Sequence, residues 1–126
     1  MLKKENRISK KKDFDRAFKA GQSFYGKIIG LKVVVNDLKY SRFGIIISAK
    51  VSKKAVERNR IRRIIREEIK ELIQKINSGK DFVFIIKSEA KKLNSKEIRL
   101  IINNLLIKES LKQNKEPDNR KNEFFI

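Results

Sequence analysis

The stretch "KKAVERNRIRRIIRE", Lys53 to Glu67, combines a high density of positive charge with the apolar spacing of a buried helix. Seven of its fifteen residues are Lys or Arg, and only two are acidic. Ile61, Ile65 and Ile69 recur every four residues and form one apolar stripe at helical spacing. Like charges crowded on one helix repel each other unless a polyanion neutralises them. The stretch therefore predicts a helix that packs on a core and also faces a polyanion.

The charges of this predicted helix are sorted by sign on either side of the apolar stripe. On a helical wheel, one flank carries Asn59, Arg63, Arg66 and Lys70, and the other carries Glu57, Glu67, Glu68 and Glu71. A helix that only needs to be soluble intersperses its signs, because opposite charges three or four residues apart attract. A solvated charged face is the usual explanation for a charge run, but sorted signs favour a surface that faces phosphate groups. The arginines fit this interpretation, since a guanidinium can fork onto two phosphate oxygens.

Composition narrows the possible functions further. The 126 residues suit one domain, and 19 of the 33 Lys and Arg residues, but only 5 of the 15 acids, fall in residues 1–63. A net charge of +18 placed so unevenly predicts a located nucleic-acid-binding face. The chain contains no Cys and no His, and no apolar run is long enough for a membrane span. The first residues lack the apolar core of a secretory signal, so we expect a cytoplasmic protein without membrane contact.

Periodicity and turn residues predict alternating helices and strands around the basic helix. The expected elements are a helix at 10–20, strand sequence at 24–35 broken near Gly26, a strand at 42–48, the basic helix at 55–77, a strand at 81–87 and a helix at 95–112. The strand at 42–48 is expected to pair antiparallel with the strand before it. Residues 113–126 are polar and predict a disordered tail after a domain at 1–112.

This order predicts an α+β fold in which helices cover a mostly antiparallel sheet in a single-domain two-layer sandwich. The basic helix would connect two strands as a β-α-β unit if those strands are parallel. Such crossovers are normally right-handed.

Several stretches together resemble the protein subunit of bacterial ribonuclease P. "AVERNRIRRIIRE" (55–67) is similar to the Arg-Asn-Arg signature of that family, and "KKDFDRAFKAGQS" (11–23) is similar to its first helix. "SRFGIIISAK" (41–50) and "KDFVFIIKSEA" (80–90) resemble the strands on either side of the long helix. The resemblance spans residues 7–110 in order. It implies an α-β-β-β-α-β-α order with a four-stranded sheet and, against the default, a left-handed crossover.

The resemblance also implies a function and a set of site residues. The protein would bind a catalytic RNA and the 5′ leader of precursor tRNA, and so assist RNA-catalysed removal of the leader. The residues expected to face the RNA subunit or the cleavage site are Lys50, Lys53, Lys54, Arg58, Asn59, Arg60, Arg62, Arg63 and Arg66. The residues expected to line the leader cleft are Phe14, Phe18 and Lys32, the last at a position where many members carry an aromatic residue.

No side-chain constellation for hydrolysis is evident in the chain. Without histidine, a protein nuclease would need clustered carboxylates, and the acids of the basic half are scattered. We therefore expect no catalytic residue and no metal ligand in the protein, with Mg²⁺ held mainly by the RNA subunit, and a monomeric protein. The alternatives are a ribosomal or general RNA-binding protein with no enzymatic role, and a DNA-binding protein that reads the major groove. The second alternative requires a short helix before the basic helix, where strand-like sequence stands instead.

Overall fold

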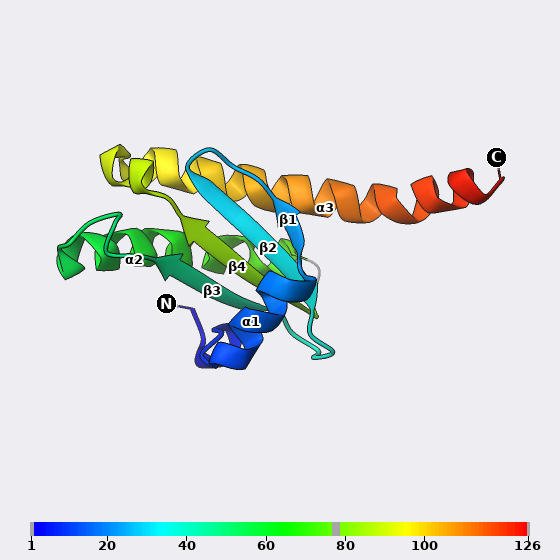
Figure 1. Ribbon diagram of the computed structural model, residues 1–126, viewed down its shortest axis with the longest axis horizontal. Helices are drawn as coiled ribbons and strands as arrows, with labels where there is room; N and C mark the ends of the chain where they lie inside the picture. The colour runs from blue at the N-terminus through cyan, green and yellow to red at the C-terminus, as the bar shows by residue number, and fades with distance from the viewer. Residues whose placement is uncertain (1, 77–78, 126) are drawn as a thin grey trace.

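The computed structural model describes residues 2–76 and 79–125, with side chains described as far as Leu111. Its α-helices and strands follow the predicted order (Figure 1). They are α1 (Lys11–Ala20), β1 (Gln22–Phe24), β2 (Ile29–Val35), β3 (Arg42–Ile47), α2 (Ala55–Leu72), β4 (Lys80–Ile86) and α3 (Ser95–Phe125). Short 3₁₀ helices lie at η1 (Lys4–Asn6), η2 (Ile73–Lys75) and η3 (Ser88–Lys92). The predicted break near Gly26 is confirmed, since it separates β1 from β2.

The four strands form one mixed sheet in the order β1-β2-β4-β3. The predicted antiparallel pairing of 42–48 with the preceding strand is wrong, because β4 lies between β2 and β3. The physical reason is burial: six of the seven residues of β4 are buried, so this strand takes a central position with a neighbour on each side. β4 is antiparallel to β2 and parallel to β3, so β3, α2 and β4 form the predicted β-α-β unit.

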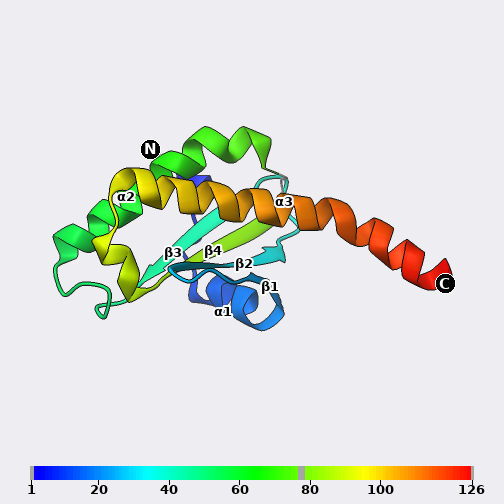
Figure 2. The ribbon, with the colours of Figure 1, turned by 90° about the horizontal axis from the view of Figure 1, so that it is seen from above.

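The main core lies between one face of the sheet and the helices α2 and α3 (Figure 2). Phe82 and Phe84 of β4 are fully buried there, and the Phe82 ring stacks on Phe43 with 5.0 Å between centroids. Ile98 and Ile102 of α3 reach the same core. The sheet and these two helices form the predicted two-layer sandwich.

Helix α1 covers part of the opposite face of the sheet (Figure 2). Ala17 is fully buried against this face, in a smaller cluster with Ile8 and Val83, and Phe14 packs beside them. Phe14 approaches the sheet at Gly44, where an added Cβ would lie 2.5 Å from the ring. A glycine is therefore needed at this position of β3 for α1 to sit so close.

A buried carboxylate fixes α1 to the sheet. Asp81 is fully buried and accepts hydrogen bonds from Arg42 Nη2 (2.7 Å), Arg42 Nε (2.9 Å) and Asn36 Nδ2 (2.9 Å). From α1, Arg16 Nη2 donates to the same carboxylate at 3.1 Å, and Asp13 pairs with Arg42 at 3.3 Å. These bonds satisfy a charge that would otherwise be costly to bury, and they join helix α1 to β3 and β4.

Helix boundaries differ from prediction at two places. Helix α2 ends at Leu72 and is followed by η2, and the predicted stop at Asn77 and Ser78 lies outside the described residues. Helix α3 continues to Phe125, so the predicted end near Lys112 is wrong. Polar sequence removes packing surface, but Gln, Lys, Glu and Arg remain good helix formers. A separate tail at 113–126 stays a prediction, since the side chains there lie outside those described.

We predict that Asp81→Asn lowers the free energy of unfolding by about 3 kcal/mol, because it leaves the Arg16 and Arg42 guanidinium groups beside a neutral amide. Chemical denaturation checks this value. Asp15→Asn on the exposed side of α1 is the control and is expected to stay within about 0.5 kcal/mol of wild type. Equal effects of the two substitutions would contradict the role of Asp81.

Candidate nucleic-acid interface

Helix α2 divides its surface between the sheet, α3 and solvent. Ile61, Ile65 and Ile69 are fully buried toward the core, as the spacing predicts. Ile64 and Glu68 are buried as well. Glu68 lies toward α3, where its carboxylate meets Arg99 and Asn103. The basic positions are thereby restricted to the remaining part of the helix.

Two residues of the acidic flank of α2, Glu67 and Glu68, pair with an arginine of α3. Arg99 of α3 donates from Nη2 to Glu67 Oε2 at 2.6 Å and from Nη1 to Glu68 Oε1 at 3.5 Å. The hydrogen bond with Glu67 is the main reason that the pKa of Arg99 is raised. These two ion pairs join α2 to α3 and provide Glu67 and Glu68 with a cation inside the protein.

Three arginines of α2 lie together at one hollow of the surface. Asn59, Arg62, Arg63 and Arg66, here called the basic flank, line one open hollow of about 410 Å³ together with Glu67. Arg62 Nη1 donates to Asn59 Oδ1 at 3.1 Å, which holds these two side chains next to each other. Among the described residues, neither Arg63 nor Arg66 forms an ion pair, so their charge is available to an external anion.

Arg7 extends the basic flank from the N-terminal segment. Residue 7 bridges to Phe43 of β3, and the next backbone N–H, that of Ile8, donates to the Phe43 carbonyl. The pKa of Arg66 is lowered, first by partial burial and then by the positive charges of Arg7 and Arg62. Arg7 Nε is buried without a hydrogen-bond partner among the described residues. Three like charges held together in this way favour an anionic ligand.

Two arginines of the predicted RNA-facing set contact backbone carbonyls outside α2. Arg58 Nη1 donates to the Ser52 carbonyl at 2.6 Å, and Arg60 Nη2 contacts the Leu93 carbonyl at 3.5 Å. Neither residue lines the hollow of the basic flank. Sequence spacing grouped these arginines with the others, whereas the structure directs them to the loop before α2 and to the segment before α3.

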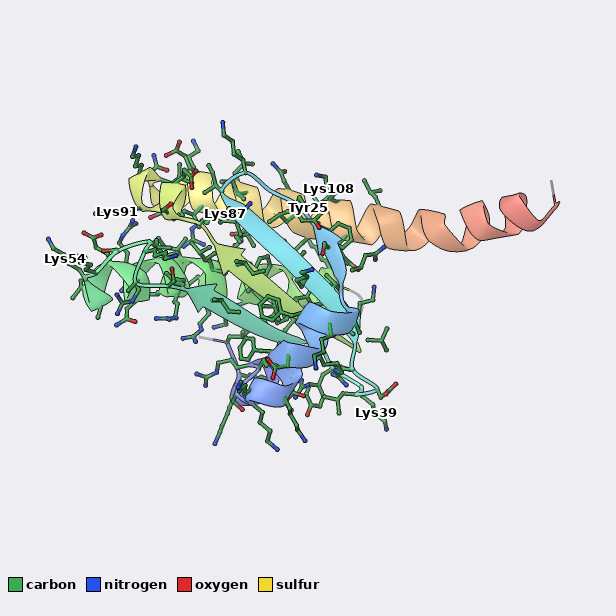
Figure 3. All side chains as sticks on the ribbon, viewed as in Figure 1. Tyr25, Lys39, Lys54, Lys87, Lys91 and Lys108 are labelled. Carbon is green, nitrogen blue, oxygen red and sulfur yellow. The ribbon has the colours of Figure 1, made fainter. Side chains whose placement is uncertain are left out.

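The predicted lysines lie on the loop that leads into α2. Lys50, Lys53 and Lys54 are exposed, and Figure 3 shows Lys54 near the start of α2. The loop is held by Ser52, whose Oγ donates to Glu57 Oε2 at 2.7 Å and accepts from the Lys54 N–H at 3.1 Å. The bond from Ser52 is the main cause of the lowered pKa of Glu57. The lysines therefore project from an ordered loop beside the N-terminus of α2.

The predicted leader-cleft residues lie on the α1 face of the sheet, away from the main core. Phe14 is half-buried against Gly44, so it is chiefly a packing residue. Phe18 is 41% exposed, and it offers aromatic surface next to that packing contact. Lys32 is half-buried on β2, and its Nζ donates to Ser23 Oγ at 2.6 Å.

The described residues contain no group of three or more acids placed to hold a metal ion. In the same part of the chain, no helix is long and apolar enough to cross a membrane.

Arg7 was missed by sequence analysis, because it lies outside any periodic element and reaches the site only through its bridge to β3.

The fold and the interface define a small α+β protein in which the basic flank of α2 forms a surface suited to a polyanion. Comparisons with known proteins make the assignment specific: the family model Ribonuclease P matches residues 2–110. The chain is 39% identical over 100 residues to the ribonuclease P protein component of Clostridioides difficile strain 630, covering 79% of this chain and 87% of that protein. It is 33% identical over 109 residues to the corresponding component of a Pseudanabaena species, covering 86% and 94%.

Solved structures agree with the sequence comparison. The RNase P protein of Staphylococcus aureus superposes with a TM-score of 0.76 at 30% identity, covering 83% of this chain and 94% of that one. The Thermotoga maritima protein superposes with a TM-score of 0.72 at 29% identity, covering 79% and 94%. The chain belongs to the ribonuclease P protein family.

We predict that substitution of Arg66 on α2 affects RNA binding and that substitution of Arg99 on α3 affects stability. Arg66→Ala should weaken binding to the catalytic RNA of ribonuclease P by about 1 kcal/mol and reduce the dependence of log K on log salt, because one phosphate contact is lost. Arg99→Ala should leave RNA affinity nearly unchanged and lower the thermal midpoint of the free protein, because its charge is neutralised by Glu67 and Glu68.

Filter binding across a range of salt concentrations, together with thermal unfolding, measures both quantities. An unchanged salt slope for Arg66→Ala would show that this arginine only solvates the helix.

Proposed function

We propose that this chain is the protein component of a ribonuclease P ribonucleoprotein, in which it binds the catalytic RNA and the 5′ leader of precursor tRNA. The chain belongs to this family, and the observation that best supports the proposal is the grouping of arginines on α2. Among the described residues, Arg63 and Arg66 of this group form no internal ion pair. Catalytic RNA supplies the polyanion that such a surface favours. The result of the reaction would be the mature 5′ end of tRNA.

The two basic regions suggest a division of roles. The basic flank and Arg7 would contact phosphates of the catalytic RNA or of the substrate near its cleavage site, and the exposed lysines before α2 would extend this surface. The α1 face of the sheet is chemically different, since it combines aromatic and apolar surface with lysine. Such a combination suits unpaired nucleotides, whose bases can stack while their phosphates meet ammonium groups. This face would therefore receive the single-stranded leader.

The chemistry of cleavage would belong to the RNA subunit. The protein has no histidine, and its described acids form no metal-holding cluster. The Mg²⁺ that supports cleavage would be held mainly by RNA, and the protein would help by binding substrate and neutralising phosphate charge. In this proposal the protein is a monomer that acts in the cytoplasm.

A ribosomal or general RNA-binding protein would share the basic composition, so the experiment must separate that class from this one. We predict that purified protein, freed of RNA, cleaves no precursor tRNA. Adding it to the catalytic RNA at low Mg²⁺ should raise the rate of leader removal, because the cations of the protein replace part of the metal requirement. Gel analysis of 5′-labelled precursor measures both reactions.

An unrelated protein of similar net charge serves as the control for nonspecific neutralisation. Cleavage by the protein alone would contradict the absence of side-chain catalysis. Equal stimulation by the control protein would favour the general RNA-binding class.

A further inference from the structure

Helix α3 carries an apolar ridge on the side that faces away from the sheet. Leu100, Ile107 and Leu111, here called the α3 ridge, are spaced by seven and four residues, so they lie along one line of the helix surface. They are 60%, 52% and 54% exposed, whereas Ile98 and Ile102 of the same helix are fully buried in the core. Figure 2 shows α3 lying across one face of the sheet. Three large apolar side chains in one exposed line indicate an interaction surface, since exposed apolar residues are normally scattered singly.

A hollow lies on each side of the α3 ridge. The first, of about 240 Å³, lies between α3 and the loop that joins β1 to β2. The second, of about 260 Å³, lies between α3 and the end of α2 with η2. Ile101 and Lys108 line the first hollow and Asn103 and Ser110 the second, which places the hollows on opposite sides of the ridge. Both volumes are below the range of roughly 300–1,000 Å³ typical of small-molecule sites, so each hollow suits an inserted side chain.

The first hollow combines apolar walls with a positive rim. Its walls are four aliphatic side chains from the loop, β2 and α3, namely Ile28, Ile29, Ile101 and Leu105. Lys27 and Lys108 are exposed at its rim, and the described residues that line it include no acid. Neither lysine forms an ion pair among the described residues. Figure 3 shows Lys108 close to Tyr25, which also lines this hollow.

The loop wall of the first hollow is held in place by β4 and the residue that follows it. The Lys87 N–H donates to the Ile28 carbonyl at 2.9 Å, and Lys87 Nζ donates to the Gly26 carbonyl at 2.7 Å. Gly26 permits the tight loop, because an added Cβ would collide with the Ile29 carbonyl oxygen. The hollow is therefore preformed, and binding would not have to order the loop.

The second hollow has a similar character. Leu72 and Ile76 contribute apolar walls at the end of α2 and after η2, and Lys75 is exposed at the rim. The acid in its lining, Glu109, is buried and accepts from Lys80 Nζ at 2.8 Å. Since this carboxylate is already paired inside the protein, Lys75 gives the rim a positive charge.

The chemistry of the two hollows selects among possible occupants. Aliphatic walls offer no stacking partner for bases, so RNA would use only the lysines. A lipid surface would cover a ridge but would not fill a hollow on each side of it. A second copy of this chain would bring lysine against lysine at a net charge of +18. An amphipathic helix fits, because its apolar side chains recur every three or four residues and can enter the hollows, while acids on its flanks can pair with the lysines.

We propose that the α3 ridge and its two hollows form a docking surface for an acidic amphipathic helix of a partner protein. The partner helix lies along α3 with apolar side chains in the hollows. Its acids pair with Lys27 and Lys108 on one side and with Lys75 on the other. No residue of the basic flank lines either hollow, so the partner and RNA bind at the same time. The inference goes beyond the proposed function, which concerns RNA alone.

The test uses full-length protein and a synthetic peptide as the probe. The peptide has about 20 residues, enough to form a helix, with leucine at the a and d positions of its heptads and glutamate on both flanks. A matched peptide carries lysine in place of every glutamate. Fluorescence anisotropy measures both dissociation constants. Only the acidic peptide should bind saturably, and the amide chemical shifts that change should centre on α3 and the β1–β2 loop.

Two pairs of substitutions test the apolar and the charged parts of the surface. Leu100→Gln with Ile107→Gln removes apolar surface from the ridge, and Lys27→Glu with Lys108→Glu reverses the charge of the rim. Each pair is expected to weaken binding of the acidic peptide about tenfold. The charge-reversed protein should instead bind the lysine peptide, which would also show that it is folded.

Lys11→Glu with Lys12→Glu is the matched control, because it makes the same change of charge at exposed positions of α1. It should change the affinity for the acidic peptide by less than about twofold. The thermal midpoints of all three variants should equal that of wild type, since every substituted side chain is exposed. Catalytic RNA should not displace the peptide.

Three results would overturn the inference. The first is an acidic peptide that does not bind saturably, or that is weakened as much by the α1 control as by the ridge substitutions. The second is displacement of the peptide by catalytic RNA, which would place the peptide on the basic flank. The third is binding to vesicles of phosphatidylglycerol and phosphatidylcholine, lost in the ridge variant, without any binding of the peptide. None of these results depends on cleavage of precursor tRNA, so the proposed function is tested separately.

Discussion

Helix α2 faces the sheet, helix α3 and solvent on different sides, and the rest of the structure depends on this constraint. Its isoleucines are buried in the core, Glu67 and Glu68 pair with Arg99 on α3, and the basic flank lies on its solvent side. Among the described residues, Glu67 and Glu68 form ion pairs with Arg99 and not with the arginines of the basic flank. The packing of α3 against α2 therefore contributes to the charge of the interface as well as to the core. An RNA partner would supply the missing negative charge.

On the opposite face of the sheet, a buried charge positions the covering helix. There the buried carboxylate of Asp81 gathers Arg16, Arg42 and Asn36 and holds α1 over one end. Since α1 is only ten residues long, Ile85 near the other end of β4 is only partly buried. Burial at one end and access at the other are two results of one helix length.

Sequence reasoning was most successful where a single element determines the outcome. The start of α2 at Ala55 and its buried isoleucine stripe are confirmed, because helical periodicity is a local property. Strand pairing was predicted wrongly, since the insertion of β4 between β2 and β3 depends on contacts far apart in the chain. The same limit applies to Arg7, which joins the site through a bridge to β3, and to Arg58, which turns toward Ser52. The division of the arginines into those that line the basic flank and those that donate to backbone carbonyls required the positions of α3 and the preceding loop.

Repulsion between Arg66 and its neighbours Arg7 and Arg62 in the free protein would favour the binding of an external anion. A double-mutant cycle with Arg7→Met and Arg66→Met, measured by the free energy of unfolding, tests it most directly. If the two charges repel, removal of one stabilises the wild type more than it stabilises the protein that already lacks the other. We expect such a coupling of about 0.5 kcal/mol, decreasing with added salt. A coupling of zero, or one showing that the two arginines stabilise each other, would contradict it.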